Sequence, residues 1–199
     1  MTLQNKQAYP KVCLDILDTL KKGLSSSLTY HCLEHTLDVA NVCNFYINHY
    51  EIESSIADLI RIAAISHDYG YIKSPINHEE NSILLVKPYL SLLYSKEELK
   101  LISGMIRATK VPQNPHTLYE EILADADLDY LGRNDYDMWS NRLYLEFSHF
   151  GVVNSEKEWL AMQIQFLENH TYHTALAKTN RDQAKIIKVE ELQDRLNKN

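Results

Sequence analysis

The sequence predicts an all-α protein in which several helices share one core. Apolar residues recur at spacings of three and four along most of the chain, while strand-like alternation is nearly absent. Only five glycines and five prolines interrupt the 199 residues. A chain of this length can bury a substantial core, and it shows no internal repeat of fixed period. We therefore expect one helical domain over residues 1–199, with a core at 30–170 and terminal helices within 1–24 and 175–199 packed on it.

The first three helices follow from breakers and apolar spacing. One helix should begin after Pro10 and stop at Gly23, because proline suits a helix start and glycine a helix end. A polar connector follows at residues 25–29. The second helix should start between Tyr30 and Leu33 and run toward Tyr50. The third should span the apolar run at residues 56–66.

The later helices are marked by capping residues. Four pairs have an N-cap residue with glutamate three positions later, the spacing of a capping box: Asn77 with Glu80, Ser95 with Glu98, Thr117 with Glu120, and Ser155 with Glu158. They predict helices near 78–90, 96–110, 118–131 and 156–169, and aromatic spacing adds one at 135–147. In the tail from Arg181, an apolar stripe suits packing on the domain or on a second subunit in a homodimer: Ile186, Val189, Leu192 and Leu196.

Composition restricts the partners. A formal charge of −7 argues against duplex nucleic acid, which needs a basic surface, but leaves room for a small anionic substrate. The three cysteines are odd in number and form no C-x-x-C pair, so they fit reduced thiols. The longest apolar run is too short for a membrane span, and no signal peptide is evident. We expect a cytoplasmic protein that binds no membrane.

The doublet His67-Asp68 closes the third predicted helix. On a period of 3.6, His67 continues the face of Ile56, Ile60 and Ala63, which the helix must bury. Taken alone, this pattern favours a hydrogen-bonded core histidine over a metal ligand. The choice between the two depends on whether other ligands exist.

Other inward-facing polar residues supply such ligands. His31 and His35 are four residues apart, and His35 heads an apolar stripe of its own. In the run from Leu123 to Leu131, Asp127 shares the apolar face, whereas Asp125 lies on the other side as a supporting acceptor, a surface charge or a substrate contact. Buried polar groups need partners, and one divalent ion would satisfy several of them together. We therefore expect a metal site with Asp127 as its distant carboxylate.

The order of His35, then His67-Asp68, then Asp127 resembles the HD superfamily of metal-dependent phosphohydrolases. The resemblance covers the chain from about Tyr30 to His170, and a small group of predicted HD phosphohydrolases also has segments like Ala108-Thr109-Lys110 and Phe166 to His170. Tyr30-His31 with His35 is similar to the start of the cyclic-nucleotide phosphodiesterase site. One departure lies in the turn after the doublet, where many HD enzymes have a lysine and this chain reads Asp68-Tyr69-Gly70-Tyr71.

The resemblance implies a divalent ion (Mn, Mg, Fe, Co or Ni) held by His35, His67, Asp68 and Asp127. Asp68 would also take part in catalysis by helping to activate water, and His31 would act as general acid. Further residues could contact substrate phosphate, although each also has an ordinary structural interpretation: Arg107, Lys110, His78 and Asp125.

Three functions remain open at this stage. The leading one is hydrolysis of a small phosphomonoester, nucleotides included. The second is a phosphodiesterase acting on a cyclic or linear nucleotide. The third is a non-catalytic HD module that senses a ligand. A helical interaction protein without metal is the contrasting case, and elemental analysis separates it from the others.

Overall fold

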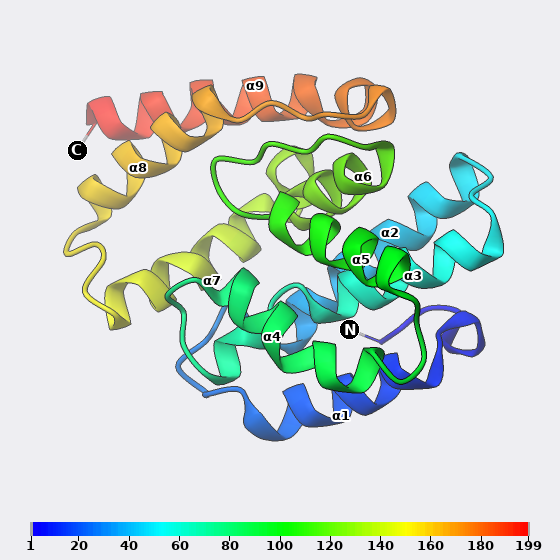
Figure 1. The fold of residues 1–199 in the computed structure, drawn as a ribbon. Coiled ribbons are helices and arrows are strands. Elements are labelled where there is room, and N and C mark those ends of the chain that lie inside the picture. The colour runs from blue at the N-terminus through cyan, green and yellow to red at the C-terminus, as the bar shows by residue number, and fades with distance from the viewer. Residues whose placement is uncertain (1, 199) are drawn as a thin grey trace. The chain divides into compact units, whose positions relative to one another are not determined.

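The computed structural model describes residues 2–198, which form nine α-helices and three short 3-10 helices with no strand (Figure 1). This confirms the all-α class. The chain divides into two compact units. The N-terminal unit comprises the residues up to Ser25 together with His31–Asp127. The C-terminal unit comprises Ser26–Tyr30 and the residues from Leu128 onward. The expected single domain stays a prediction.

The N-terminal unit contains six α-helices: α1 (Lys11–Gly23), α2 (Leu33–His49), α3 (Ser54–Ser66), α4 (His78–Leu90), α5 (Lys96–Ala108) and α6 (Leu118–Asp127). The unit also contains two 3-10 helices, η1 (Lys6–Ala8) before α1 and η2 (Tyr69–Ile72) between α3 and α4. In the packing, α3 contacts α1, α2 and α5, while α6 packs on α2 and α5. The α3 helix is therefore central to this unit.

The sequence of α3 explains its central place. From Leu59 to Ser66 every residue except Arg61 is buried. A helix that is apolar on nearly every side is stable only when neighbours cover all of its faces. His67 is the C-cap of this helix and continues the buried run. The doublet is therefore held at the end of the most buried helix of the unit.

The predicted caps are mostly correct. Ser95 forms a complete capping box with Glu98, and Ser155 and Thr117 each accept a hydrogen bond from the backbone N–H three residues on. Asn77 is the exception, because its side chain makes no cap hydrogen bond. Its φ of 53° places it in the left-handed region, where asparagine is tolerated. The helix nevertheless begins at His78, as the spacing predicts.

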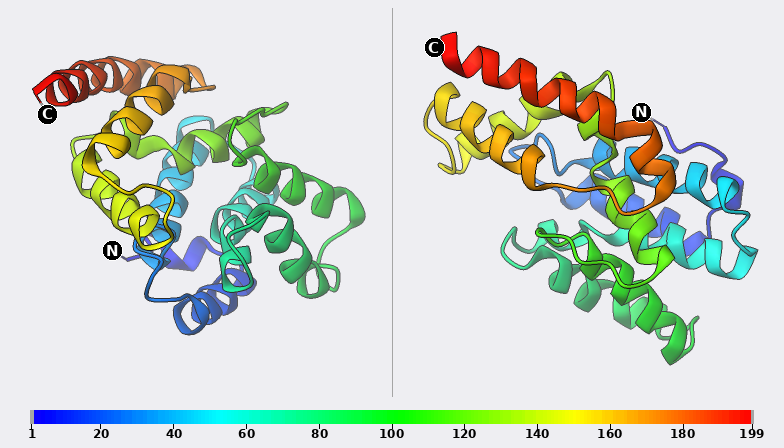
Figure 2. Two further views of the ribbon diagram at one scale, coloured as in Figure 1. Left: turned by 90° about the vertical axis from the view of Figure 1, so that its left-hand side faces the viewer. Right: turned by 90° about the horizontal axis from the view of Figure 1, so that it is seen from above.

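The C-terminal unit is built from η3 (Asp129–Gly132), α7 (Tyr136–His149), α8 (Glu156–Asn169) and α9 (Ala175–Lys198). The α8 and α9 helices lie side by side (Figures 1 and 2). The prediction of one helix over 118–131 is wrong at its end, because α6 stops at Asp127 and a 3-10 turn follows. Asp129 belongs to that turn, where it accepts hydrogen bonds from Arg133 and Arg181.

The tail helix, α9, begins at Ala175, inside the expected range 175–199, and carries the apolar stripe. Its stripe is only partly covered, since Leu192 is buried while the side chain of Ile186 is 50% exposed. The three cysteines are free thiols, as expected. Among the described helices, none combines the length and the apolar character that crossing a membrane requires.

Candidate metal centre

Four side chains from three helix ends of the N-terminal unit meet at one place. His35 lies in the first turn of α2, His67 and Asp68 follow the last turn of α3, and Asp127 is the final residue of α6. These residues are far apart in sequence, and the packing of α2 on α3 and α6 brings them together. The site therefore lies wholly within one compact unit.

The donor atoms are at short and similar distances. His35 Nε2 lies 3.0 Å from Asp127 Oδ1 and 3.6 Å from Asp68 Oδ2. His67 Nε2 lies 3.3 Å and 3.2 Å from the same two oxygens. The donors of His35, His67 and Asp127 all fall within 4.8 Å of one another. Each imidazole therefore faces both carboxylates.

The tautomer of His67 follows from its second nitrogen. Its Nδ1 lies 2.8 Å from the carbonyl oxygen of Ala64. A carbonyl only accepts, so Nδ1 carries a hydrogen, and in the neutral ring Nε2 presents a lone pair to the cluster. His67 Nε2 and Asp68 Oδ2 are both buried, and their ion-pair distance is short, yet neither has a partner with hydrogen-bond geometry. Such orphaned atoms are expected where a cation binds.

Burial and charge act against each other in this cluster. Burial raises the pKa of the Asp68 carboxyl, but the neighbouring histidines, His67 most of all, together lower it well below the usual range. Burial likewise raises the pKa of Asp127, while His35 and His67 bring it down to about 2. For His67, burial lowers the pKa and the two carboxylates raise it well above its ordinary value. Without metal, the carboxylates are thus anionic beside a protonated imidazole.

The donor set fits a divalent cation. Nitrogen and carboxylate ligands bind first-row ions at about 2.0–2.2 Å, which places neighbouring ligands about 3 Å apart. The four cross distances between imidazole and carboxylate, 3.0 to 3.6 Å, are close to that spacing. Two imidazoles with two carboxylates suit a first-row ion and leave positions for water and substrate. A cation would also replace the proton that the two carboxylates attract to His67.

Comparison with protein families supports this interpretation. Residues 32–129 match the family model described as HD domain. The chain contains an HD domain. The matched range starts just before α2 and ends two residues after Asp127, so it includes all four clustered residues. HD domains are typically metal-dependent hydrolases that bind divalent cations. A search of curated proteins found no match.

The doublet of the HD domain is fixed to α4 by one serine. Ser82 is completely buried, and its hydroxyl accepts a hydrogen bond from the Gly70 N–H at 2.7 Å and donates one to the His67 carbonyl at 2.7 Å. Gly70 also packs against α4, where a Cβ atom would lie 2.0 Å from the His78 carbonyl oxygen. Only glycine fits there. The backbone around the doublet is therefore held to α4 at His67 and at Gly70.

We expect Ser82→Ala to weaken both folding and metal binding, because it leaves a buried N–H and a buried carbonyl without partners. The free energy of unfolding should fall by about 1–3 kcal/mol. Metal affinity should fall by about tenfold or more, as for other groups that orient ligands. Urea unfolding and metal titration measure the two effects. In the control Ser91→Ala, an exposed hydroxyl bonded only to the Lys87 carbonyl is removed, and both quantities should stay unchanged. Equal behaviour of the two variants would contradict the role of Ser82.

His31 lies next to the cluster, in the segment that precedes α2. The α2 helix begins at Leu33 with Cys32 as its N-cap, so His31 precedes it. The rings of His31 and His35 therefore do not lie on one helix face; they are nearly perpendicular, with centroids 6.2 Å apart. The His31 ring stacks instead on Tyr71, with centroids 4.2 Å apart and planes at 19°. It is partly exposed, unlike His35 and His67.

His78 approaches the other oxygen of the doublet carboxylate. Its Nε2 lies 3.4 Å from Asp68 Oδ1 and 3.6 Å from the buried Glu79 carboxylate. Asp68 therefore faces His35 and His67 with one oxygen and His78 with the other. Of the proposed substrate contacts, His78 is the one that the fold places against the cluster.

Three other predicted substrate contacts are not part of the cluster. Asp125 is completely buried on α6, which excludes the surface-charge alternative. The group of side chains that could hold a metal, here called the metal-compatible group, contains His35, His67 and Asp127 but not Asp125. Arg107 is exposed and forms a two-pronged pair with Glu80, whose oxygens lie 2.5 and 3.0 Å from its nitrogens. Lys110 is exposed beyond the end of α5.

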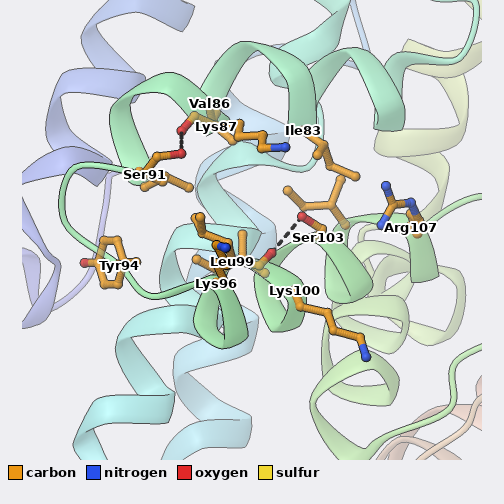
Figure 3. Close-up of a pocket in the computed structure, with 13 residues that line it drawn as sticks. Ile83, Val86, Lys87, Ser91, Tyr94, Lys96, Leu99, Lys100, Ser103 and Arg107 are labelled. Atoms are coloured by element: carbon orange, nitrogen blue, oxygen red, sulfur yellow. Dashed lines mark hydrogen bonds between the residues drawn. The ribbon is translucent and has the colours of Figure 1, made fainter.

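Arg107 also lines a groove of about 540 Å³ between α4 and α5 (Figure 3). The groove has an apolar lining with exposed cationic residues, among them Lys87, Lys96 and Lys100. None of the four clustered residues lines it. Phosphate binding by Arg107 at the metal cluster therefore has no support from the contacts of this side chain.

In the C-terminal unit, the pKa of His170 is shifted in the opposite direction from that of His67. Burial first, and then Lys185 and His173, lower the pKa of His170 to about 3. Its Nε2 is buried without a hydrogen-bond partner, and the ammonium of Lys185 donates to its carbonyl. His170 is therefore neutral near pH 7 and offers no positive charge to a phosphate.

The pattern in the sequence did not reveal Ser82, Glu79 or the role of Tyr71. Ser82 falls on the buried face of α4, where a small polar residue in an apolar stripe is a weak signal. Glu79 follows the predicted helix start and had an ordinary interpretation as a first-turn acid. Ser82 bonds to His67 and Gly70, and Glu79 lies beside His78. Which residues face the doublet and the turn after it cannot be read from periodicity.

Proposed function

We propose that this chain is a metal-dependent phosphohydrolase that cleaves a small phosphomonoester, nucleotides included, with water as acceptor. The observation that carries the proposal is the arrangement of two imidazoles and two carboxylates at cation-binding distances, with the partly exposed His31 beside them. Membership of the HD family supports metal-dependent hydrolysis in general. The substrate class and the residue roles are our inference.

In this proposal His35, His67, Asp68 and Asp127 hold one divalent cation. When bound, such a cation polarises a phosphoryl oxygen and lowers the pKa of a neighbouring water molecule. Asp68 is placed to act in catalysis as well, because its anionic carboxylate is part of this set and would orient the attacking water. The Ala64 carbonyl keeps the His67 ring in the orientation that directs Nε2 at the cation.

His31 would donate a proton to the leaving-group oxygen. Its ring lies outside the buried ligand set and is partly exposed, which suits a group that must reach the substrate. A general acid matters most when the leaving group is a poor one, such as the alkoxide of a ribose. The negative net charge of the chain is compatible with an anionic substrate only if local cations receive it.

A weaker second cation is compatible with the same geometry. Asp68 Oδ1 is directed to His78, so this carboxylate could bridge two ions, with Glu79 close to the second. Metal titration with calorimetry tests this. We expect one tight binding event, followed by at most one weaker event that His78→Ala removes.

The test of the proposed function is a screen of metal-reconstituted protein. Chelator-treated protein is reloaded separately with Mn, Mg, Fe, Co or Ni, and assayed on phosphomonoesters, mononucleotides, and cyclic and linear dinucleotides. Metal-dependent release of inorganic phosphate from monoesters supports the proposal. The matched control is the chelated protein, which should be inactive.

Two other outcomes favour the alternatives. Cleavage of diesters without attack on monoesters would favour a phosphodiesterase, for which the Tyr30-His31 and His35 spacing is the specific observation. Nucleotide binding with stoichiometric metal but no turnover on any substrate would favour a non-catalytic sensor. Protein without metal and without ligand would overturn all three.

A further inference from the structure

Tyr71 contacts both of the histidines that lie at the edge of the metal cluster. Its ring stacks on His31, with centroids 4.2 Å apart and planes at 19°. It also meets His78, with centroids 4.4 Å apart and planes at 34°. All three rings are partly exposed, whereas His35 and His67 are buried. Tyr71 is thus in contact with the side chains that a substrate would meet first.

The backbone of Tyr71 is firmly held. The Tyr71 N–H donates to the Asp68 carbonyl at 3.0 Å, and the preceding Gly70 is bonded to Ser82 and packed on the His78 carbonyl. These contacts tie the turn that carries Tyr71 to the doublet and to α4. A ring held on such a turn can fix the orientation of a side chain that packs against it.

His31, by contrast, receives no orientation from a helix. It lies outside α2, and the N-cap residue between them, Cys32, has an extended backbone. A side chain on an irregular segment has more conformational freedom than one in a packed helix, and ordering it has an entropic cost. Stacking against a fixed aromatic ring offsets part of that cost. The stacking on Tyr71 thus contributes to the orientation of the His31 ring relative to the cluster.

We propose that Tyr71 is the positioning residue for His31, and that its ring holds the imidazole in the orientation needed to reach the leaving group. The expected effect on catalysis rests on the proposed function, whereas the orientation of the His31 ring by Tyr71 does not. Tyr71 acts through His31 and is not assigned a step of its own. The ring, rather than the hydroxyl, is the group responsible.

The experiment compares Tyr71→Phe, which keeps the ring, with Tyr71→Leu, which removes it. Tyr89→Leu is the matched control, because Tyr89 is an exposed tyrosine on α4 with a side chain 62% exposed. Two readouts are taken. The first is the chemical shift of the His31 ring protons, which a stacked aromatic ring displaces, with the signal assigned through His31→Gln. The second is kcat and KM on an alkyl phosphate and on 4-nitrophenyl phosphate, whose leaving group needs little protonation.

We expect Tyr71→Leu to shift the His31 ring signal and to lower kcat on the alkyl phosphate by about tenfold or more. KM, metal content and the rate on 4-nitrophenyl phosphate should stay within about twofold. Tyr71→Phe and Tyr89→Leu should behave like the parent protein. This combination separates a positioning effect from general damage, which would lower both rates equally.

Several results would overturn the inference. An unchanged ring signal in Tyr71→Leu would show that Tyr71 does not orient His31. Equal losses on both substrates would indicate a purely structural role, and failure of Tyr71→Phe would show that the ring is not the responsible group. If the parent protein hydrolyses no phosphomonoester in the metal-reconstitution screen, the proposed function fails, and the ring signal alone then decides whether Tyr71 orients His31.

Discussion

We expect Asp127→Asn to remove the divalent metal from the purified protein, with affinity falling by about 100-fold or more. The substitution replaces an anionic carboxylate by a neutral amide of the same size, at a position 3.0 Å from His35 Nε2 and 3.3 Å from His67 Nε2. Elemental analysis measures the loss directly. The rise in unfolding temperature on adding metal should disappear as well, because only a ligand that binds the folded state stabilises it.

Asp68→Ala should abolish both metal retention and hydrolysis.

The helix of Asp127 supplies a matched control. Asp125 is two residues earlier on α6, is completely buried, and lies outside the metal-compatible group. Asp125→Asn should therefore keep the metal, even if burial of a different polar group changes stability. Loss of metal in Asp125→Asn with retention in Asp127→Asn would show that the assignment of the carboxylates is reversed.

The second large effect is expected at His31. His31→Gln should lower turnover on esters with poor leaving groups by roughly 10²–10⁴, the usual contribution of a positioned general acid. Metal content should not change, because His31 lies outside the ligand set. The rate on 4-nitrophenyl phosphate should fall far less, since that leaving group departs without protonation. Comparing kcat for the two esters in both proteins measures the difference, and equal rates on an alkyl phosphate would remove the acid role.

The positions of the helices were largely predictable because their causes are local. A period of three to four apolar residues, a proline at a start, a glycine at an end and serine or threonine caps all act within one turn of the chain. The prediction failed at the end of α6, where a 3-10 turn replaces the helix and Asp129 bonds to the distant Arg181. Asp129 is held by Arg133 and Arg181, and the helix expected to continue through it ends at Asp127.

The clustered residues were also predictable, but for a different reason. His67 follows an apolar face, so its burial could be inferred, and the order of His35, the doublet and Asp127 resembles one family. The comparison of helix faces favoured Asp127 as the clustered carboxylate. For Asp125, however, it left a surface charge open, although this side chain is buried. Asp125 is more buried than Asp127, because the other side of α6 is covered too. Periodicity indicates which residues share a face, but not which faces are covered.

By itself, the sequence determined an all-helical chain, a negatively charged protein without disulfides, and a set of histidines and aspartates of the kind that binds a divalent cation. Only the tertiary structure decided how they meet: the distances among the four donors, the Ala64 carbonyl that sets the His67 tautomer, the Ser82 bridge and the stacking of His31 on Tyr71. The physical reason is the range of the interactions. Helix formation depends on neighbours three or four residues apart, whereas a metal cluster depends on contacts between residues 35, 67 and 127, which only packing creates.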